Sequence, residues 1–445
     1  MTELQLSNTK RIGFLGFGIS NRSVYDFLKD LGSFEFTVRD RLPQRIPFIP
    51  ARTYYGNDIL KNIDEDVLFI SPSFKRNLPE LDEAIKRGTI LSSDAELFFA
   101  IYGKEAYGIT GTSGKSTVTH LISEMLTVSG TTAYPIGNFG TGFLSYSKNA
   151  FTVVAELSSF QLMYLEPKLT CAVITNIGED HLNWHSDVTE YRQAKLKILK
   201  NADKAVIDAD CRVTVDAISS RKVSAAVSAQ VPYKLLKEKI DAENYLTLSD
   251  DSILLNGELF FDISRAIRRE DYNLKNYMLS AAAVLDRANP RAMSEVANSF
   301  KGLPHRCEQV SFANGISYIN SSIDTSPERA LSTILAVSGA KVPIFCGTGK
   351  SLSYKRLAEE TVRSCEGAVL MGEVGDIMEK ELKSVCASFK AKKALGMKEA
   401  VRAAENILRG EGSVILAPAG VSYDKYKSFE QRGNDFRLSI TKKLK

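Results

Sequence analysis

The chain has few of the features that mark secreted or membrane-bound proteins. Its six cysteines stand singly at positions 171, 211, 307, 346, 365 and 386, without a Cys-x-x-Cys pair. We therefore expect reduced thiols, and neither a disulfide framework nor a zinc site. No apolar run reaches the roughly 18 residues of a membrane span, and the N-terminus lacks the charged-then-apolar pattern of a secretory signal. These absences predict a cytoplasmic protein without membrane insertion.

The chain also has little excess of charge of either sign. The formal net charge is only +4 over 445 residues, which gives no argument for a nucleic-acid partner. The chain is 44% hydrophobic and 25% charged, as is ordinary for a globular protein. At about 150 residues for each domain, the length predicts about three domains. We expect the protein to be a monomer.

The most informative segment that is present runs from Gly108 to Thr117 and reads GITGTSGKST. It lies between an expected strand and an amphipathic helix expected over residues 116–129. Glycines at 111 and 114 allow backbone N–H groups to turn toward an anion, Lys115 adds a positive charge, and the hydroxyl of Ser116 can reach Mg²⁺. The match is to a variant P-loop, because Ile109 stands where the strict form has glycine. The segment predicts ATP binding; a glycine-rich turn with an incidental lysine is the alternative.

Strands and helices alternate along the whole chain, which predicts an α/β fold with largely parallel sheets. In the first part, strands are expected at 11–15, 34–38, 67–70 and 91–93, with a helix over 21–31. The turn Gly16-x-Gly18 has asparagine at position 21 in place of a third glycine. By itself it leaves open whether the turn binds a nucleotide-like diphosphate or is only tight.

Two further series follow the first. The second begins at Ala106, has strands at 153–155 and 172–175, a β-hairpin over about 246–261 with turns at 249–251 and 256–257, and a closing helix over 274–288. The third has strands at 316–319, 342–346, 368–371 and 413–417. We predict an N-terminal Rossmann-like domain over residues 1–98, a central P-loop domain with a mainly parallel sheet over 99–301, and a small Rossmann-like domain over 302–445.

Acidic and basic side chains follow the central strands. Glu156 comes directly after an apolar strand, where a carboxylate beside a P-loop strand is well placed to hold Mg²⁺. His181 follows the next strand, and histidines are scarce in this chain, so it is a candidate ligand. A solvated strand-end glutamate and a structural histidine are the alternatives. By composition alone, Lys195 would be a solvated lysine on a helix.

Eight segments, in chain order, together resemble the Mur ligases across nearly all of the sequence. They are GTSGKST at 111–117, GN at 137–138, ELSSFQ at 156–161, EDH at 179–181, YRQAK at 191–195, Asn273 with Asn276, LPHR at 303–306 and FEQRG at 429–433. Within that family, ELSSFQ and FEQRG favour the member that adds D-glutamate to UDP-N-acetylmuramoyl-L-alanine in cytoplasmic peptidoglycan precursor synthesis.

The resemblance implies that ATP phosphorylates the substrate carboxylate to an acyl phosphate, which the amino group of the incoming amino acid then attacks. A sister ligase that adds L-glutamate or another acidic amino acid remains open. So does a non-catalytic sensor that binds UDP-sugar and ATP. Ligation like that of folylpolyglutamate synthase is disfavoured, because that family lacks an N-terminal Rossmann domain.

The resemblance also implies roles for individual residues. The catalytic residues would be Lys115, Glu156, His181 and Lys195, and the Mg²⁺ ligands Ser116, Glu156, His181 and Lys195, with Lys195 carbamylated so that it offers oxygen ligands. ATP would contact Gly111, Thr112, Ser113, Gly114, Lys115, Ser116, Thr117, Asn273, Asn276 and Arg306. UDP would lie against Ile19, Ser20, Asp40, Arg41, Ser71 and Pro72. The muramoyl-alanine part would meet Asn138, Ser158, Ser159 and Gln161, and glutamate would meet Lys350, Ser422, Tyr423 and Phe429.

Three positions depart from the family pattern. Ser321 stands where the family has the aspartate that touches the ATP ribose, and Ile323 where it has a lysine that helps to bind glutamate. Tyr272 replaces a histidine. We hypothesise that Asp324 replaces the lost acid, whereas nothing replaces the lysine. The departures leave the ATP chemistry intact and bear on the amino-acid pocket.

Overall fold

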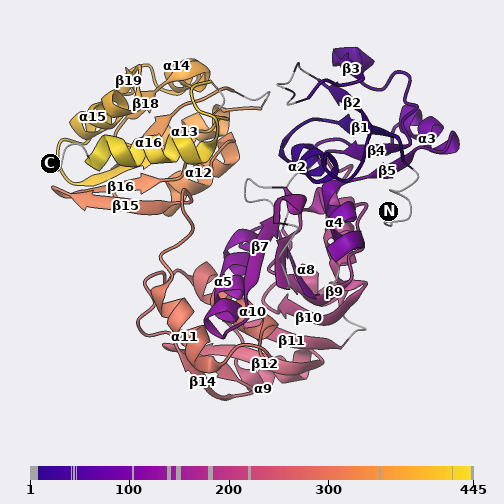
Figure 1. The fold of residues 1–445 in the computed structure, drawn as a ribbon. Coiled ribbons are helices and arrows are strands. Elements are labelled where there is room, and N and C mark those ends of the chain that lie inside the picture. Colours follow the sequence, from indigo (N-terminus) through magenta and orange to yellow (C-terminus); the bar gives the residue numbers. More distant parts are fainter. Residues whose placement is uncertain are drawn as a thin grey trace. The chain divides into compact units, whose positions relative to one another are not determined.

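The computed structural model describes residues 9–41, 43, 46, 48–102, 105–137, 142–146, 152–178, 184–218, 222–349, 352–422 and 424–441. They form three mostly parallel sheets with helices between the strands (Figure 1), which confirms the predicted α/β class. The chain divides into two compact units, Met1–Phe300 and Lys301–Lys445. The domain boundaries at 98/99 and 301/302 stay predictions; the first falls inside helix α4 (Asp94–Tyr102).

The first sheet has the order β3-β2-β1-β4-β5 and is parallel throughout, as a Rossmann-like sheet requires. Its strands are β1 (Arg11–Leu15), β2 (Glu35–Asp40), β3 (Arg52–Tyr55), β4 (Val67–Ile70) and β5 (Ile90–Ser92). Side chains alternate between two apolar clusters: Phe14 and Phe69 face the cluster that includes residues of α2 (Ile19–Leu28), while Leu15 and Ile70 face that of α3 (Pro79–Lys86).

The missing third glycine of the first turn is explained by Asn21. Its buried Nδ2 donates to the carbonyl oxygens of Leu15 (3.2 Å), Gly16 (2.8 Å) and Phe69 (3.0 Å). The side chain thus satisfies backbone acceptors at the ends of two neighbouring strands. The asparagine therefore stabilises the turn through these hydrogen bonds. Helix α2 begins at Ile19, two residues before the predicted start.

The second sheet has the order β14-β13-β12-β11-β10-β9-β6-β8-β7. It is parallel from β7 to β12, and β12, β13 and β14 form the predicted antiparallel edge, with Asn256 (φ 53°) and Gly257 (φ 89°) in the left-handed region at the second turn. The strands are β6 (Glu105–Thr110), β7 (Ala133–Gly137), β8 (Thr152–Glu156), β9 (Leu169–Ile174), β10 (Ala202–Asp208), β11 (Val223–Ser228), β12 (Ala242–Ser249), β13 (Ser252–Leu255) and β14 (Glu258–Asp262).

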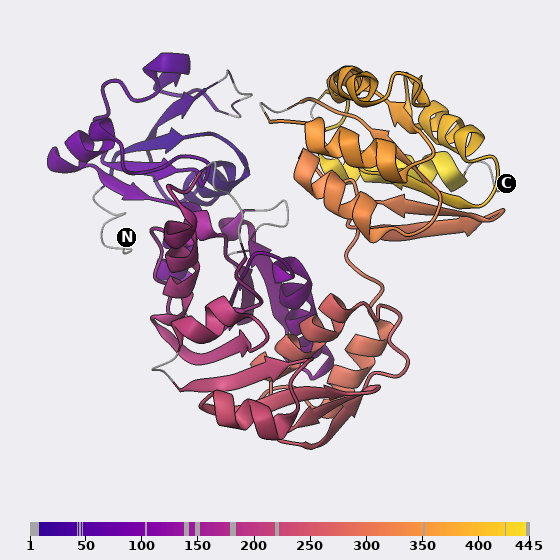
Figure 2. The same ribbon diagram turned by 180° about the vertical axis from the view of Figure 1, so that it is seen from behind.

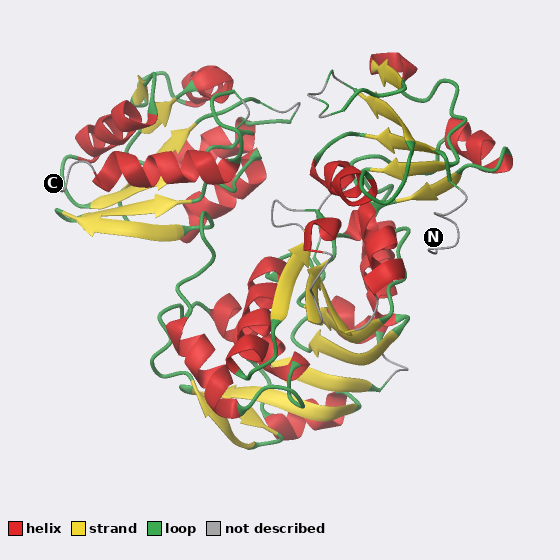
Figure 3. Cartoon of the chain, in the orientation of Figure 1, coloured by secondary structure: helices red, strands yellow, loops and turns green. Residues whose placement is uncertain are grey.

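Helices cover this sheet along its length (Figure 3). They are α5 (Lys115–Val128), α6 (Ser159–Leu162), α7 (Val188–Leu196), α8 (Arg212–Ala217), α9 (Tyr233–Lys239), α10 (Asp271–Ala283) and α11 (Pro290–Ser299). Helix α5 packs against β7 and β8 and also against α10 and α11. Among the residues described, no helix has both the length and the apolar composition needed to cross a membrane.

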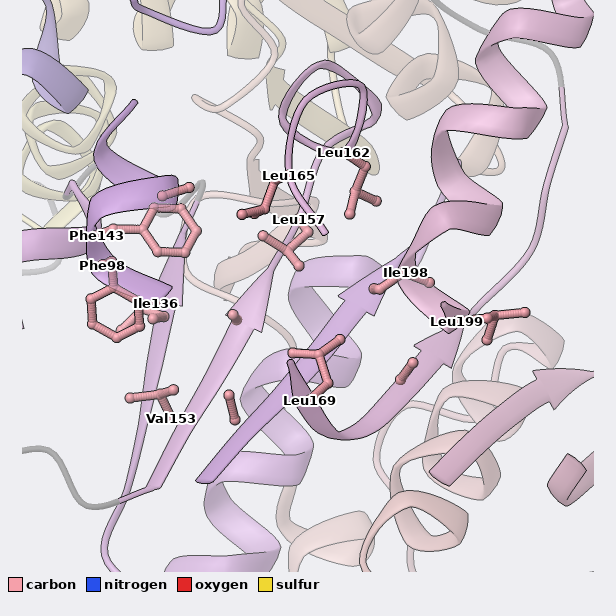
Figure 4. Close-up of a cluster of buried hydrophobic side chains, with 14 of the residues drawn as sticks. Phe98, Ile136, Phe143, Val153, Leu157, Leu162, Leu165, Leu169, Ile198 and Leu199 are labelled. Carbon is pink, nitrogen blue, oxygen red and sulfur yellow. The ribbon is translucent and has the colours of Figure 1, made fainter. Parts of the chain in front are cut away.

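A buried apolar cluster runs along the central strands, from Val153 and Leu169 near the starts of β8 and β9 to Leu157 just after β8 (Figure 4). Leu157 follows β8, Leu169 opens β9, and Ile198 follows α7; all three are fully or almost fully buried. Phe98 of α4 and Phe143 pack nearby with ring centroids 5.7 Å apart. Close packing of this kind fixes the strand ends from which the polar residues project.

The third sheet has the order β15-β16-β20-β17-β18-β19, with only β15 antiparallel. Helices lie on both of its faces (Figures 1 and 2): α12, α13 and α14 share one apolar cluster, α15 and α16 the other. The elements are β15 (Glu308–Ala313), β16 (Ile316–Asn320), β17 (Lys341–Phe345), β18 (Ala368–Leu370), β19 (Ala391–Lys393), β20 (Gly412–Leu416), α12 (Pro327–Ala336), α13 (Lys355–Ser364), α14 (Gly372–Val385), α15 (Met397–Leu408) and α16 (Phe429–Thr441).

Candidate functional site

The predicted P-loop joins β6 to α5. Gly111 (φ 154°) and Gly114 (φ 82°) both have positive φ, and Gly114 is the N-cap of α5. A Cβ at Gly114 would lie 2.7 Å from Oδ1 of Asn276, so a larger residue would collide with helix α10. The backbone therefore requires glycine here. The first turn of α5 presents N–H groups and the positive end of the helix dipole, which suit an anion.

Neighbouring elements hold the loop in place. The N–H of Thr112 donates to the carbonyl oxygen of Asn176 (2.9 Å), and the N–H of Ser113 donates to Oδ1 of Asn176 (3.0 Å). The hydroxyls of Thr112 and Tyr191 are 2.9 Å apart, and the N–H of Gly178 donates to Oγ1 of Thr112 (2.8 Å). The end of β9 and helix α7 thus fix the loop before any ligand binds.

The two side chains that matter most for phosphate chemistry lie at the start of α5. Nζ of Lys115 donates to the carbonyl oxygens of Gly111 and Thr112, both at 3.0 Å, so the ammonium group lies over the loop. Oγ of Ser116 donates to Oε2 of Glu156 at 2.6 Å. A hydroxyl and a carboxylate oxygen at adjacent positions are ligands that Mg²⁺ prefers.

Lys195 belongs to this site, so the reading of it as a solvated helix lysine is wrong. The residue is only 2% exposed, and Nζ donates to the carbonyl oxygen of Gly111 at 2.7 Å. The ammonium group also lies 4.7 Å from the ring centroid of Tyr191. Helix α7 packs its lysine against the phosphate loop, which composition alone does not reveal. Among the described residues no cluster of three or more His, Cys, Asp or Glu side chains is suited to a metal, and His181 lies outside them.

The two asparagines of α10 lie against the same loop. Nδ2 of Asn273 donates to Oε2 of Glu270 (2.9 Å), and Nδ2 of Asn276 donates to Oδ1 of Asn273 (3.4 Å). Because Asn276 Oδ1 is also close to Gly114, the start of α10 and the P-loop form one surface. The structure therefore brings together the predicted loop residues, Glu156, Lys195, Asn273 and Asn276. Tyr272 is exposed on the same helix.

Lys275, between these asparagines, is bound by two buried carboxylates. Its Nζ lies 3.2 Å from Oδ2 of Asp208, at the end of β10, and 3.2 Å from Oδ2 of Asp210. Burial raises the pKa of Asp208 to about 6, although Lys275 acts in the opposite direction. This triad anchors the start of α10 to the central sheet.

The six residues predicted to bind UDP gather at the carboxyl edge of the first sheet. Ile19 and Ser20 follow β1, Asp40 and Arg41 lie at and after the end of β2, and Ser71 and Pro72 follow β4. The N–H of Phe17 donates to Oδ2 of Asp40 at 2.7 Å. Open α/β sheets bind ligands at this edge.

The residues predicted for the muramoyl-alanine part differ in their surroundings. Ser158 and Gln161 form a capping box at α6: the backbone N–H of Ser158 donates to Oε1 of Gln161 (2.9 Å), and Oγ of Ser158 accepts from the N–H of Gln161 (3.3 Å). Ser159 is buried, and its Oγ lies 2.9 Å from Nε2 of His185. Asn138 lies outside the described residues.

In the second unit, Lys350 and Tyr423 lie outside the described residues. Ser422 is buried in the segment after β20, and Phe429 begins α16. Arg306 follows His305, which has a positive φ of 61° and an Nδ1 that lies 2.9 Å from Nδ2 of Asn320. The described residues predicted for glutamate thus lie near the carboxyl ends of parallel strands.

The segment after β16, which departs from the family pattern at Ser321 and Ile323, buries the side chain of Asp324 in the interior of the second unit. That residue is 5% exposed, and its Oδ2 accepts from Oγ1 of Thr333 at 2.7 Å. Oγ of Ser321 lies 3.1 Å from the same hydroxyl. Burial raises the pKa of Asp324. The hypothesis that this acid takes over a ribose contact is not supported, because its carboxyl is bound in the interior.

Arg432 joins three segments of the second unit. Its side chain is fully buried: Nε donates to Oγ of Ser322 (3.0 Å), Nη2 to the carbonyl oxygen of Ser322 (2.8 Å), and Nη1 to that of Gly420 (2.9 Å). Oγ of Ser322 in turn donates to the carbonyl oxygen of Phe429 (2.7 Å). The arginine of the FEQRG segment therefore connects the segment after β16, the segment after β20 and the start of α16.

The sequence did not predict a role for His185, for Lys275 or for Asp208 and Asp210, which bind Lys275. Asp208 could have been found from its position at a strand end, but β10 itself was not predicted, because it begins with the polar sequence Ala-Asp-Lys. His185 gave no signal of its own. Its partners lie 26 residues earlier and five residues later in the chain.

The glycine-bearing loop at the start of α5, its lysine, and a strand-end glutamate bound to its serine define a P-loop nucleotide-binding protein of the α/β class. A sequence model of the Mur ligase middle domain matches residues 109–284. The UDP-N-acetylmuramoylalanine–D-glutamate ligase of Clostridium kluyveri is 31% identical over 455 residues, covering 97% of each chain. The corresponding protein of Acetivibrio thermocellus is 30% identical over 453 residues, covering 96% of this chain and 95% of its own. The chain belongs to the Mur ligase family.

Solved structures agree in fold. The UDP-N-acetylmuramate-alanine ligase of Thermotoga maritima matches 98% of this chain and 100% of its own with a TM-score of 0.60 at 18% identity. A pseudomurein peptide ligase type C of Methanothermus fervidus matches the same shares with a TM-score of 0.55 at 16% identity. The identification of the family made from the eight motifs is confirmed.

Proposed function

We propose that this protein is an ATP-dependent ligase that adds D-glutamate to UDP-N-acetylmuramoyl-L-alanine in cytoplasmic peptidoglycan precursor synthesis. The observation that carries the proposal is the contact of Ser116 with Glu156 (2.6 Å) beside Lys115, at the start of the P-loop helix. The names and full-length coverage of the relatives support the choice of substrates.

Lys115 and the N–H groups at the start of α5 would bind the β- and γ-phosphates. A carboxylate that attacks a γ-phosphate approaches a group of like charge, so fixed positive charge at that point lowers the barrier. The loop is already fixed by Asn176 and Tyr191, so little reorganisation is needed when ATP binds. The attack forms an acyl phosphate and releases ADP; attack by the amino group then forms the amide and releases phosphate.

The oxygen atoms at this site fit Mg²⁺. Ser116 and Glu156 would hold one ion, which would supply positive charge for the transferring phosphoryl group. His181 and Lys195 would serve a second ion. An ammonium group repels Mg²⁺, so we propose that Lys195 acts as its carbamate, which supplies oxygen atoms at a buried position beside Gly111.

The other proposed contacts follow the two sheets. UDP would lie at the carboxyl edge of the first sheet, against Asp40 and Ser71. The muramoyl-alanine part would lie near Ser158 and Ser159. In the second unit, Lys350, Ser422, Tyr423 and Phe429 would bind glutamate, and Arg306 would contact phosphate. Asn273 and Asn276 would face adenine.

The proposal is tested by measuring phosphate release from ATP with UDP-N-acetylmuramoyl-L-alanine, in parallel with D-glutamate, with L-glutamate and without an amino acid. We expect release that depends on D-glutamate. Preference for L-glutamate would identify a sister ligase. The segment with Ser321 and Ile323, which departs from the family pattern, would then be the first place to look for the altered amino-acid preference. ATP binding without amino-acid-dependent release would contradict a catalytic role.

A further inference from the structure

His185 joins two segments that carry proposed metal ligands. Its side chain is fully buried; Nε2 lies 2.9 Å from Oγ of Ser159, and Nδ1 lies 3.2 Å from Oε2 of Glu190. Ser159 opens α6, three residues after Glu156. Glu190 lies in the first turn of α7, the helix that carries Lys195.

The hydrogen-bond directions in this chain follow from Glu190. Its carboxylate can only accept, and it also accepts from the backbone N–H of Ser186 (2.9 Å), which lowers its pKa. Nδ1 of His185 therefore carries a proton. Burial lowers the pKa of His185, against the influence of Glu190 and with that of Lys195 and Lys75. In the tautomer with the proton on Nδ1, Nε2 accepts a hydrogen bond from the hydroxyl of Ser159.

Aromatic rings fix the same imidazole on its other sides. The ring of His185 stacks on Phe160 (centroids 5.6 Å apart, 13° between planes) and meets Tyr191 edge-on (5.3 Å, 72°). The hydroxyl of Tyr191 lies 2.9 Å from Oγ1 of Thr112 in the P-loop. The histidine thus connects three elements around the loop.

We propose that Ser159, His185 and Glu190 form a hydrogen-bonded clamp that sets the separation between the segment of Glu156 and the helix of Lys195. His185 is a positioning residue: it acts on the metal through Glu156 and Lys195 without touching it. Outer partners that orient metal ligands typically change metal affinity by about 10- to 100-fold when they are removed. The clamp rests on the proposed function, because those two residues are ligands only there.

The test measures Mn²⁺ binding by electron paramagnetic resonance, with a non-hydrolysable ATP analogue and bicarbonate in the buffer. His185→Phe keeps the ring packing and removes both nitrogens. Ser159→Ala removes the hydroxyl that is hydrogen-bonded to Nε2 of His185. We expect each to weaken Mn²⁺ binding about tenfold. His185→Gln keeps an acceptor near the position of Nε2 but loses the contact of Nδ1 with Glu190, so it should also weaken Mn²⁺ binding, by less than His185→Phe does. The matched control is His120→Phe, since His120 pairs with Glu124 on α5 (3.1 Å) outside the clamp.

Glu156→Gln tests the assignment of the metal site separately from the clamp. If it weakens Mn²⁺ binding while folded His185→Phe and Ser159→Ala bind like the parent, the clamp is wrong and the metal site stands. If Glu156→Gln has no effect, the metal assignment fails and the clamp with it. A His185→Gln variant that binds Mn²⁺ like the parent would also overturn the clamp, because the contact with Glu190 would then be dispensable. A merely structural role would lower the melting temperature without changing the Mn²⁺ affinity of the folded protein.

Discussion

The central site and the segments around Arg432 in the second unit arrange charged side chains in opposite ways. Lys115, Glu156 and Lys195 all gather at the phosphate loop, where a ligand of high charge can complete their environment. Asp324 and Arg432 are buried among partners of their own unit. The first arrangement is suited to chemistry, and the second holds together the segments after β16 and β20 and the start of α16. Substitutions should therefore change kinetics in the first region and stability in the second.

The largest effect is expected from Lys115→Met. The variant removes the positive charge that the proposed phosphoryl transfer needs, so kcat should fall about 10³-fold. The measurement is steady-state phosphate release at saturating substrates, together with a melting temperature close to that of the parent. Lys204→Met is the control, because Lys204 pairs with Asp286 at the surface. A fall of less than about tenfold for Lys115→Met would contradict the assignment of the central site.

Arg432→Met tests the other side of the comparison. It removes the hydrogen bonds to Ser322 and Gly420 and leaves buried acceptors unpaired, so the free energy of unfolding of the second unit should fall by about 3 kcal/mol. Urea unfolding, followed by a probe in that unit, measures it. Arg363→Met, whose side chain is 74% exposed and pairs with Glu360, should cost less than about 1 kcal/mol. Equal losses in the two variants would show that the buried hydrogen bonds of Arg432 stabilise the second unit no more than a surface ion pair does.

Lys275→Met should act on nucleotide binding rather than on turnover. Without its lysine, the buried pair Asp208 and Asp210 loses its counter-charge, and α10 can shift relative to the P-loop. We expect KM for ATP to rise about five- to tenfold, a loss of about 1 kcal/mol of binding, with kcat within about threefold. Lys222→Met, whose surface partner is Glu243, is the control. A change in kcat alone would show that the triad does not serve the nucleotide.

The smallest effect is expected from Asp324→Asn, and it depends on pH. Because the folded pKa of Asp324 is raised, its favourable contribution to stability is present below the unfolded pKa and is lost as pH rises through the folded value. The asparagine variant should lack that loss, so it should be more stable than the parent at pH values above the folded pKa of Asp324. An increase in KM for ATP in Asp324→Asn would instead favour a role in nucleotide binding.

The sequence predicted the fold best where strands are apolar and end in a motif. Strand β4 was predicted at its observed bounds, and the hairpin at the edge of the central sheet was predicted from Asn256 and Gly257. Strands β3, β7, β10, β11, β15 and β19 were not predicted. Several of them carry polar residues at half-buried positions, so alternation is weak, and their pairing is decided by neighbouring strands.

Local sequence patterns predicted only some of the residues of the candidate site. The P-loop and Glu156 were predicted from their position after strands, because parallel strands bring their carboxyl ends to one edge. Lys195 required the resemblance, since its burial arises from how α7 packs on the loop. His185 pairs with Ser159, 26 residues earlier, and Lys275 with Asp208, 67 residues earlier, so these contacts could not be recognised without the fold.

The proposed ligase mechanism requires transfer of phosphate from ATP to the substrate carboxylate at the central site. The direct measurement uses UDP-N-acetylmuramoyl-L-alanine labelled with ¹⁸O in its carboxylate and follows the label during turnover with D-glutamate by mass spectrometry. Formation of an acyl phosphate predicts that each released phosphate carries an ¹⁸O atom from that carboxylate. Unlabelled phosphate would mean that water attacks ATP, and would contradict a ligase mechanism at this site.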